Sequence, residues 1–357
     1  MLKNIKAILN NKLKDLASPL LAIIAGLLVG GIIMAISGYD AINGILGLLK
    51  GGFLTKYAFT STLARATPII FCGLSAAISW GSGYSSMGAQ GQMILGAITA
   101  AYVAIRCPGP AWFVVIVTLL SAMLVGGIYS LISAHISYKY NAYLLIVTLM
   151  FNYLADYFAS YLTNYVLLDP YGVDKLAIQT QKIENAILPR IFSKYTLHYG
   201  FFIALFCVVA IWFLINKTTL GYKMRMSGAN SNFAKYGGVN ASKTMYISLF
   251  ISGAIAALGG ACEVLGSKYR YVDAMITSPG YSWSGITASL MSNYNIIGVL
   301  FSSIFLAGIA IGGASVELNL SIPSELTQVI QGVITILVTA KIVINYRKKA
   351  KAREVKE

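Results

Sequence analysis

Long apolar runs, separated by short polar connections, recur along almost the whole chain. About 20 apolar residues are enough to cross a bilayer as a helix, because a helix satisfies its own backbone hydrogen bonds in lipid. With 57% hydrophobic and only 11% charged residues, the 357-residue chain has room for about ten such helices. We therefore expect an all-α polytopic membrane protein. The apolar runs lie near 19–36, 63–80, 87–105, 111–134, 142–166, 199–215, 244–266, 282–293, 296–315 and 325–344.

The positive charges predict the topology. Lys and Arg gather in residues 1–17, 216–243 and 346–357, and cytoplasmic connections of membrane proteins carry such an excess. We therefore predict a cytoplasmic amphipathic N-terminus at 1–17, a transmembrane domain at 18–345 and a basic cytoplasmic tail at 346–357. The run at 19–36 is long enough to span, which favours an uncleaved first span over a signal peptide.

The loop at 167–198 is predicted to be external and to divide the spans into two halves of about five each. Halves with an odd number of spans run in opposite senses, as in inverted-repeat transporters. Each half has a Gly/Ser-rich interruption, GSGYSSMGAQGQ at 81–92 and SPGYSWSG at 278–285, and the run at 282–293 is too short to span. Broken helices at matching places point to a solute path, although ordinary loop ends would give the same pattern. The connection at 38–61 is expected to be polar, with a surface helix around 42–49.

The segment from Asn216 to Lys243, called the central segment below, is polar and basic and has no Asp or Glu. Ser227 or Asn230 is expected to cap a short helix there, and Gly237 or Gly238 to end it. Phe233 and Tyr236 lie three residues apart and would share one face of that helix. Such a helix is suited to dock a cytosolic partner, and the alternative is a solvated loop that only follows the charge rule.

Several function classes are disfavoured. The sequence has no G-x-x-x-x-G-K-[ST] nucleotide loop, no H-E-x-x-H and no G-x-S-x-G, so we expect no catalytic residues. The four cysteines are scattered and predict neither disulfides nor a metal site. The net charge of +15 follows membrane topology and does not form a nucleic-acid-binding stripe.

Several ordered motifs resemble the permeases of ATP-binding-cassette importers in the branched-chain amino acid, ribose and nucleoside superfamily. GAQGQMILGA at 88–97 resembles that family's G-A-E-G-Q signature, and GYKMRMSGANSNFAKYGGV at 221–239 resembles its coupling loop. SGAIAALGGACEVLG at 252–266, SPGYSWSGITASLM at 278–291 and IPSELTQVIQGVIT at 322–335 follow in the family's order. The resemblance extends from about 63 to 338 and is closest to the nucleoside branch. Ser86 and Gln90 depart from the usual Asn and Glu, which puts nucleoside as the ligand in doubt.

The resemblance implies a permease subunit that is not itself an enzyme and holds no cofactor, because a separate cytosolic ATPase binds ATP and Mg. It also implies a second permease subunit, identical or paralogous, an extracytoplasmic solute-binding lipoprotein, and a place in the cytoplasmic (inner) membrane of a bacterium. The solute would be a nucleoside, a sugar, a flavin or another planar heterocycle. The residues implied in ATPase coupling are Lys223, Arg225, Gly228, Asn230, Phe233, Ala234, Tyr236 and Gly238.

Polar residues within spans are expensive and are therefore candidates for the solute path. Each has an alternative role in hydrogen bonds between helices, and this alternative is stronger for Asp156 and Glu263. Small residues four apart, Gly26 with Gly30 and Gly308 with Gly312, permit close packing within the subunit or against a second permease. The residues expected to line the path are Ser86, Gln90, Gln92, Asn152, Tyr153, Trp283 and Asn293.

Two other functions compete with the importer permease. A secondary transporter would use Asp156 or Glu263 as a proton carrier, but no Lys/Arg–carboxylate pair is evident at mid-span. A scaffold or receptor without transport would not need a coupling loop. Uptake that depends on ATP and not on a proton gradient would distinguish the importer from the first, and a flux assay would distinguish it from the second.

Overall fold

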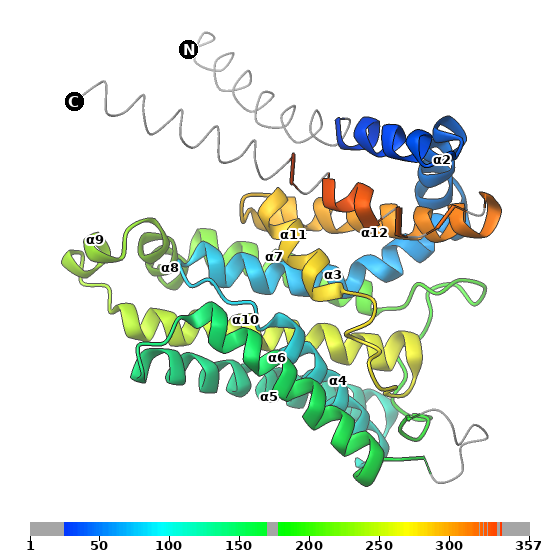
Figure 1. Ribbon diagram of the computed structural model, residues 1–357. Coiled ribbons are helices and arrows are strands. Elements are labelled where there is room, and N and C mark those ends of the chain that lie inside the picture. The colour runs from blue at the N-terminus through cyan, green and yellow to red at the C-terminus, as the bar shows by residue number, and fades with distance from the viewer. Residues whose placement is uncertain are drawn as a thin grey trace, which may run out of the picture. The chain divides into compact units, whose positions relative to one another are not determined.

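The computed structural model describes residues 25–169 and 178–320, and within 322–337 it describes 322, 323, 325, 326, 328–333, 336 and 337. The predictions for 1–17 and 346–357, and most of that for the run at 325–344, lie outside these residues. The described elements are helical, with no strand beyond isolated bridges (Figure 1). The labelled α-helices are α2 (Ala41–Leu49), α3 (Lys56–Gly81), α4 (Ala89–Arg106), α5 (Ala111–Lys139), α6 (Leu144–Tyr161), α7 (Gly200–Lys217), α8 (Thr219–Ala229), α9 (Ser231–Tyr236), α10 (Ala241–Glu263), α11 (Tyr281–Met291) and α12 (Ile296–Leu320), and the π-helical turns are η1 (Lys50–Leu54), η2 (Leu162–Val166) and η3 (Val264–Lys268). In the run at 19–36, the described part is a shorter apolar helix, Ala25–Ile36, and the predicted first span stays a prediction.

Six described helices are long and apolar enough to cross a membrane: 56–81, 111–139, 144–166, 200–217, 241–268 and 296–320. These confirm six of the predicted runs and the membrane class. The 18 residues of α4 are not apolar enough for that criterion, and α11 has only 11 residues, as the short run at 282–293 predicted. The count of about ten spans in two halves stays a prediction.

The helices of residues 63–304 form an inner and an outer set. In the most apolar window of α10 with η3, 83% of the residues are buried, whereas only 22% are buried in that of α6 with η2. Helix α4 is buried along most of its length and contacts α5, α6 and α10 (Figure 1). The outer helices α5, α6 and α7 expose apolar side chains, such as Leu120, Leu154 and Phe206. Since α4 is shielded by other helices, it does not need the apolar surface that lipid contact demands.

Glycines let these helices approach closely. A Cβ added to Gly253 on α10 would lie 2.5 Å from the carbonyl oxygen of Gly126 on α5. At the same interface the hydroxyl of Ser130 donates to the Leu249 carbonyl at 2.7 Å. Close backbone approach and a side-chain hydrogen bond are both typical of helix pairs in membranes, where burial in lipid does not drive association.

The chain forms two compact units, residues 1–62 with 305–357 and residues 63–304. In the first unit, Asp40 caps α2 by accepting from the amides of Ile42 and Asn43 at 3.1 Å, which confirms the helix predicted near 42–49. The predicted polar connection at 38–61 is wrong in its second half, where η1 and the start of α3 are helical. Thr55 caps α3 by accepting from the Ala58 amide at 3.1 Å, so the helix begins before its apolar run.

The glycine stripe of α12 packs within the first unit. A Cβ on Gly308 would overlap the ring of Phe53, and one on Gly312 would overlap the backbone of Leu48. The hydroxyl of Thr62 donates to the Gly52 carbonyl at 2.7 Å beside this contact. Of the two roles expected for Gly308 and Gly312, the structure shows packing within the subunit.

The central segment and the 167–198 loop lie at opposite ends of α10. Residues at the start of α10 contact the central segment, whereas the turn after α10 binds the loop through Leu188 N to Leu265 O and Ile183 N to Tyr269 O, at 2.9 and 2.8 Å. This arrangement agrees with the predicted placement of the two segments on different sides of the membrane.

The chain is not helical at 82–88 and at 269–280, called the first and second interruptions below. The first lies within the predicted 81–92. The second ends where the predicted 278–285 begins, because α11 already starts at Tyr281. Tyr269 and Ala274 both have φ near +58°, a left-handed conformation that stops a helix. The boundary prediction for the second interruption is therefore wrong.

Candidate functional site

The central segment folds into α8 and the short helix α9. The side chain of Asn230 caps α9 by accepting from the Phe233 amide at 3.0 Å, so of the two predicted caps it is Asn230 that acts. Gly238 ends the helix with φ at +76°, as predicted. The amides of Gly238 and Val239 donate to the carbonyls of Lys235 and Ala234 at 3.0 Å, which is the Schellman arrangement.

Helix α9 directs its two aromatic residues outward. The exposed fraction is 61% for Phe233 and 92% for Tyr236, whereas Ala234 and Val239 are buried beneath the helix. Two large exposed aromatic rings on a capped helix form a small apolar surface that has no partner in the described chain. The geometry therefore agrees with the docking prediction for these residues, whose role stays a prediction.

A basic groove lies beside α9. Lys223 of α8 and Lys243 of α10 line a cavity of about 340 Å³, with Leu220 and Ile247 among its apolar lining residues. Neither lysine forms an ion pair with any described residue. A groove with two unneutralised ammonium groups is suited to receive an acidic surface.

The end of α8 packs on the first interruption. A Cβ on Gly228 would overlap the Gly81 carbonyl and would also meet the backbone nitrogen of Gly83, whose φ is +86°. The hydroxyl of Tyr84 bonds to Ser227 Oγ and to the Ala241 carbonyl, both at 2.9 Å. Burial raises the pKa of Tyr84. Gly228 therefore serves close packing within the chain, and Ser227, which was expected as a possible cap, serves this contact instead.

Shortly after Tyr84 in the sequence come three residues that were predicted to line the path, Ser86, Gln90 and Gln92. Ser86 is buried, and its carbonyl accepts from the indole of Trp80 at 2.8 Å. Gln90 is half-buried. Gln92 is 2% exposed, and its Oε1 has no hydrogen-bond partner among the described residues. A buried acceptor without a partner costs about 1–3 kcal/mol, which makes Gln92 the motif residue with the strongest case for a solute contact.

Asn152 holds the start of α4. Its Oδ1 accepts from the Gly91 amide at 2.9 Å, and its Nδ2 donates to the Met87 carbonyl at 2.9 Å. One turn earlier, Thr148 Oγ1 accepts from the Met87 amide at 3.0 Å. Because backbone groups occupy the Asn152 amide, the geometry favours its alternative role, a hydrogen bond between helices.

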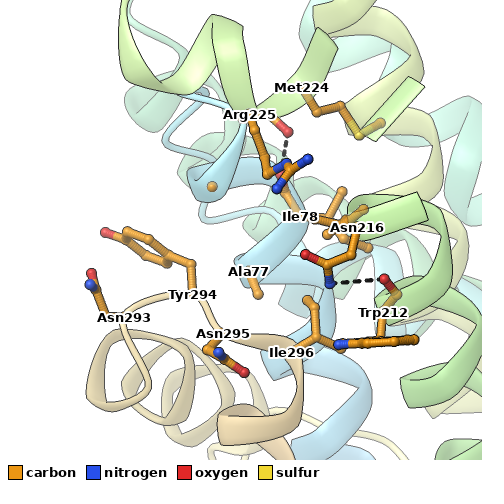
Figure 2. Close-up of a pocket in the computed structure, with 13 residues that line it drawn as sticks. Ala77, Ile78, Trp212, Asn216, Met224, Arg225, Asn293, Tyr294, Asn295 and Ile296 are labelled. Carbon is orange, nitrogen blue, oxygen red and sulfur yellow. Dashed lines mark hydrogen bonds between the residues drawn. The ribbon is translucent and has the colours of Figure 1, made fainter. Parts of the chain in front are cut away.

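Arg225 and Asn293, which the sequence assigned to different functions, line one cavity of about 360 Å³ (Figure 2). Trp212, Asn216 and Tyr294 add an indole, a carboxamide and a phenol. The cavity lies at the end of residues 63–304 that holds the central segment. Its size and its mixture of aromatic and polar groups match sites for small organic molecules.

Tyr153 and Trp283 do not lie with the other predicted path residues. The exposed fractions of their side chains are 61% and 51%, so both face the surface of the subunit. Tyr153 follows Asn152 by one residue and therefore points about 100° away on α6. A solute could contact these aromatics only on the outer surface of the subunit, either at an interface with a second subunit or on the side that faces lipid.

The other end of α10 holds a charged cluster that sequence reasoning missed in part. Glu263 is only 4% exposed and accepts from the Tyr281 hydroxyl at 3.4 Å. Arg65 lies 5.9 Å from the centre of the Tyr281 ring, and its Nε is buried without a hydrogen-bond partner. Arg65 thus lies against Tyr281, which bonds to Glu263 at the end of α10, and no ion pair joins Arg65 to Glu263 among the described residues, so the expectation of no Lys/Arg–carboxylate pair at mid-span is not contradicted. One arginine in the apolar run of α3 was the available signal.

Asp156 binds the second interruption. Its Oδ1 accepts from the Thr277 hydroxyl at 2.9 Å, and Ser160, one turn later, donates to Asp273 Oδ2 at 3.0 Å. The alternative role predicted for Asp156 was a hydrogen bond between helices, and the structure instead shows a bond from α6 to a non-helical segment.

The family model for the permease component of branched-chain amino acid transport systems matches residues 58–339. No solved structure matches the chain.

Curated relatives extend over most of the chain. The guanosine ABC transporter permease NupP of Bacillus subtilis is 31% identical over 94% of this chain and 96% of its own length. The nucleoside ABC transporter permease NupB of Lactococcus lactis is 27% identical over 98% of both chains. The glucose ABC transporter permease TsgB13 of Haloferax volcanii is 28% identical over 92% of this chain and 89% of its own.

Proposed function

The chain belongs to the family of permease components of branched-chain amino acid transport systems, and on that premise we propose that it imports nucleosides as one membrane subunit of an ATP-driven transporter. The observation that carries the proposal is the 31% identity to a guanosine permease over 94% of the chain. The nucleoside permease NupB supports the same solute class at 27%. None of these relatives is named as an ion-coupled transporter, so the secondary transporter has no support from them.

A paralogous second permease is part of the proposal. NupP and NupQ of Bacillus subtilis are 31% and 25% identical to this chain, and NupB and NupC of Lactococcus lactis are 27% and 23% identical. In both organisms two different nucleoside permeases are related to this one. We infer that the functional membrane unit pairs this chain with a similar but different subunit, in the cytoplasmic membrane of a bacterium.

The energy for transport would enter at α9. Phe233 and Tyr236 supply an exposed apolar pair for a groove on the cytosolic ATPase, and Lys223 and Lys243 supply positive charge beside it. The positive-inside rule supports a cytosolic place for this end of the chain, with both termini inside. An extracytoplasmic lipoprotein would deliver the solute to the opposite end.

The cavity that Arg225 and Asn293 share is suited to the inner part of the path. Its volume of about 360 Å³ is sufficient for a small solute, and its aromatic and carboxamide groups match the faces and edges of a purine. Departure of a solute beside the central segment would tie release to the movement of the ATPase.

The test is uptake by the reconstituted transporter, with both permeases, the ATPase and the binding protein in liposomes. We expect guanosine uptake to require ATP and to persist when a protonophore removes the proton gradient. Uptake driven by the proton gradient without ATP would refute the proposal. A complex that moves glucose but no nucleoside would refute the solute class alone.

The docking role has its own test, Phe233→Asp. A charge at an apolar interface anchor is expected to weaken ATPase binding about 30-fold, the loss typical of an interface hot spot. Phe192→Asp is the matched control, because Phe192 is also an exposed aromatic, at 51%, but lies at the opposite end of the subunit. Equal ATPase affinity of the two variants would contradict the docking role. Gly228→Trp is unsuitable, because it would also disrupt the contact with Gly81.

A further inference from the structure

One face of α6 carries polar residues at every fourth position: Thr148, Asn152, Asp156 and Ser160. Positions four apart on a helix share a face, and these four extend over about 18 Å along the axis. The first two bind the first interruption and the start of α4, and the last two bind the second interruption. Within residues 63–304, a single helix is therefore bonded to both non-helical segments.

Thr148 and Asn152 bind backbone groups that have no hydrogen-bond partner within a helix. Met87 belongs to the first interruption, and the Gly91 amide is one of the first-turn donors of α4, which have no partner within their helix. In a low-dielectric interior such groups are costly when unpaired, so Thr148 and Asn152 hold this segment firmly. Asp156 and Ser160 bind two side chains of the second interruption, Thr277 and Asp273.

The first interruption is also bonded to the central segment. Tyr84 joins Ser227 at the end of α8 to Ala241 at the start of α10, both at 2.9 Å. A displacement of α8 would therefore reach Tyr84 directly. From Tyr84 the chain continues through two residues to Met87, whose backbone is bonded to Thr148 and Asn152 of α6.

We propose that Tyr84 and the polar face of α6 (Thr148, Asn152, Asp156 and Ser160) are positioning residues that link movement of the central segment to the second interruption. This inference rests on the proposed function, because the movement comes from the ATPase. When the ATPases close, α8 displaces the first interruption through Tyr84, and α6 carries this displacement to 269–280. The two interruptions thus change together, which is what access from alternate sides requires.

Three variants remove the side-chain hydrogen bonds of this link, two bonds each at Tyr84 and Asn152 and one at Ser160. Tyr84→Phe removes only the hydroxyl, Asn152→Leu replaces the carboxamide by an apolar group of similar size, and Ser160→Ala removes the donor to Asp273. Tyr157→Phe is the control, because it also removes a tyrosine hydroxyl on α6, and Tyr157 is 75% exposed with no hydrogen bond to a described residue.

The first measurement is the number of guanosine molecules transported per ATP hydrolysed by the complete transporter in liposomes. We expect this ratio to fall about fivefold or more in each of the three variants, in the range of typical coupling energies, and to stay unchanged in Tyr157→Phe. A merely structural role would reduce the amount of folded transporter, and with it both rates, but not their ratio. Combining Asn152→Leu with Ser160→Ala should lose no more than the stronger single change.

The second measurement does not depend on the solute. A fluorophore on Ser278→Cys, in a Cys107→Ser background, reports on the second interruption while vanadate traps the ATPase in its closed state. We expect trapping to change the signal in the unaltered transporter and to have little effect in Tyr84→Phe or Asn152→Leu, although both still trap nucleotide. Normal ratios and normal signals in folded variants would overturn the proposal. Should the transporter move no guanosine, the proposed solute fails, but the trapped signal still decides this inference.

Discussion

Replacing Gly253 by Ala tests the close contact between α5 and α10. The added Cβ would lie 2.5 Å from the Gly126 carbonyl oxygen and 2.6 Å from Ser130 Cβ, whereas ordinary contact begins at 3.4 Å. The helices would have to separate by about 0.9 Å, the difference between these distances, because the nearest atom belongs to the backbone and cannot move alone. Overpacking of this kind costs about 1–3 kcal/mol.

The opposing effect is helix propensity, since Ala is favoured over Gly in a helix by about 1 kcal/mol. Separation would also stretch the bond from Ser130 to Leu249, so we expect the loss to exceed the gain. The midpoint of thermal unfolding in detergent, followed by size-exclusion chromatography of heated samples, should fall by about 2–6 °C.

Gly332→Ala is the matched control, because Gly332 is an exposed helical glycine and a Cβ there meets nothing within 4 Å. This variant should keep or slightly raise the midpoint. A midpoint for Gly253→Ala equal to or above that of Gly332→Ala would refute the packing argument.

Three further predictions concern other parts of the chain. Gln92→Leu should raise the midpoint of thermal unfolding, because it removes a buried acceptor whose missing partner costs about 1–3 kcal/mol. It should also lower uptake. If uptake fell while its dependence on solute concentration stayed unchanged, that result would argue against a solute contact. Gly238→Ala meets no atom but must adopt φ near +76°, so α9 should lose about 1 kcal/mol and ATPase binding should weaken up to about fivefold, with Gly332→Ala as the unaffected comparison. Burial lowers the pKa of His198 to about 4, with a smaller contribution from Arg190, and its Nδ1 accepts from the Gly200 amide only when the ring is neutral. The unfolded chain therefore binds a proton that the folded chain does not, and stability should fall between about pH 6.5 and 4 by on the order of 3 kcal/mol, a loss that His198→Gln should remove.

The sequence predicted the bounds of a helix well where an apolar run begins or ends beside glycines. Helix α4 (Ala89–Arg106) lies close to the predicted 87–105, and the short α11 was recognised from its length. Helix α3 begins at Lys56 and not near 63, because a helix continues into polar residues at the membrane surface, where an apolar pattern gives no signal. The left-handed residues Tyr269 and Ala274 are not of the types that mark such turns, and so the second interruption was misplaced.

The site was harder to predict, because side chains acquire their roles from distant partners. Phe233, Tyr236 and the cap at Asn230 are local features, and the sequence contains all the information that they need. Asn152 was recognisable as a polar residue in a span, but its partners Met87 and Gly91 lie more than 60 positions earlier. The pairing of Arg65 with Tyr281 likewise depends on the fold, and one arginine in an apolar run does not reveal it.

The occupied glycine stripe of α12 limits how this subunit can assemble. Since Phe53 and Leu48 already fill the space over Gly308 and Gly312, a neighbouring permease would first have to displace them. Gly308→Cys would therefore give no cross-link to a neighbouring permease. The search for the dimer contact should therefore begin on other helices.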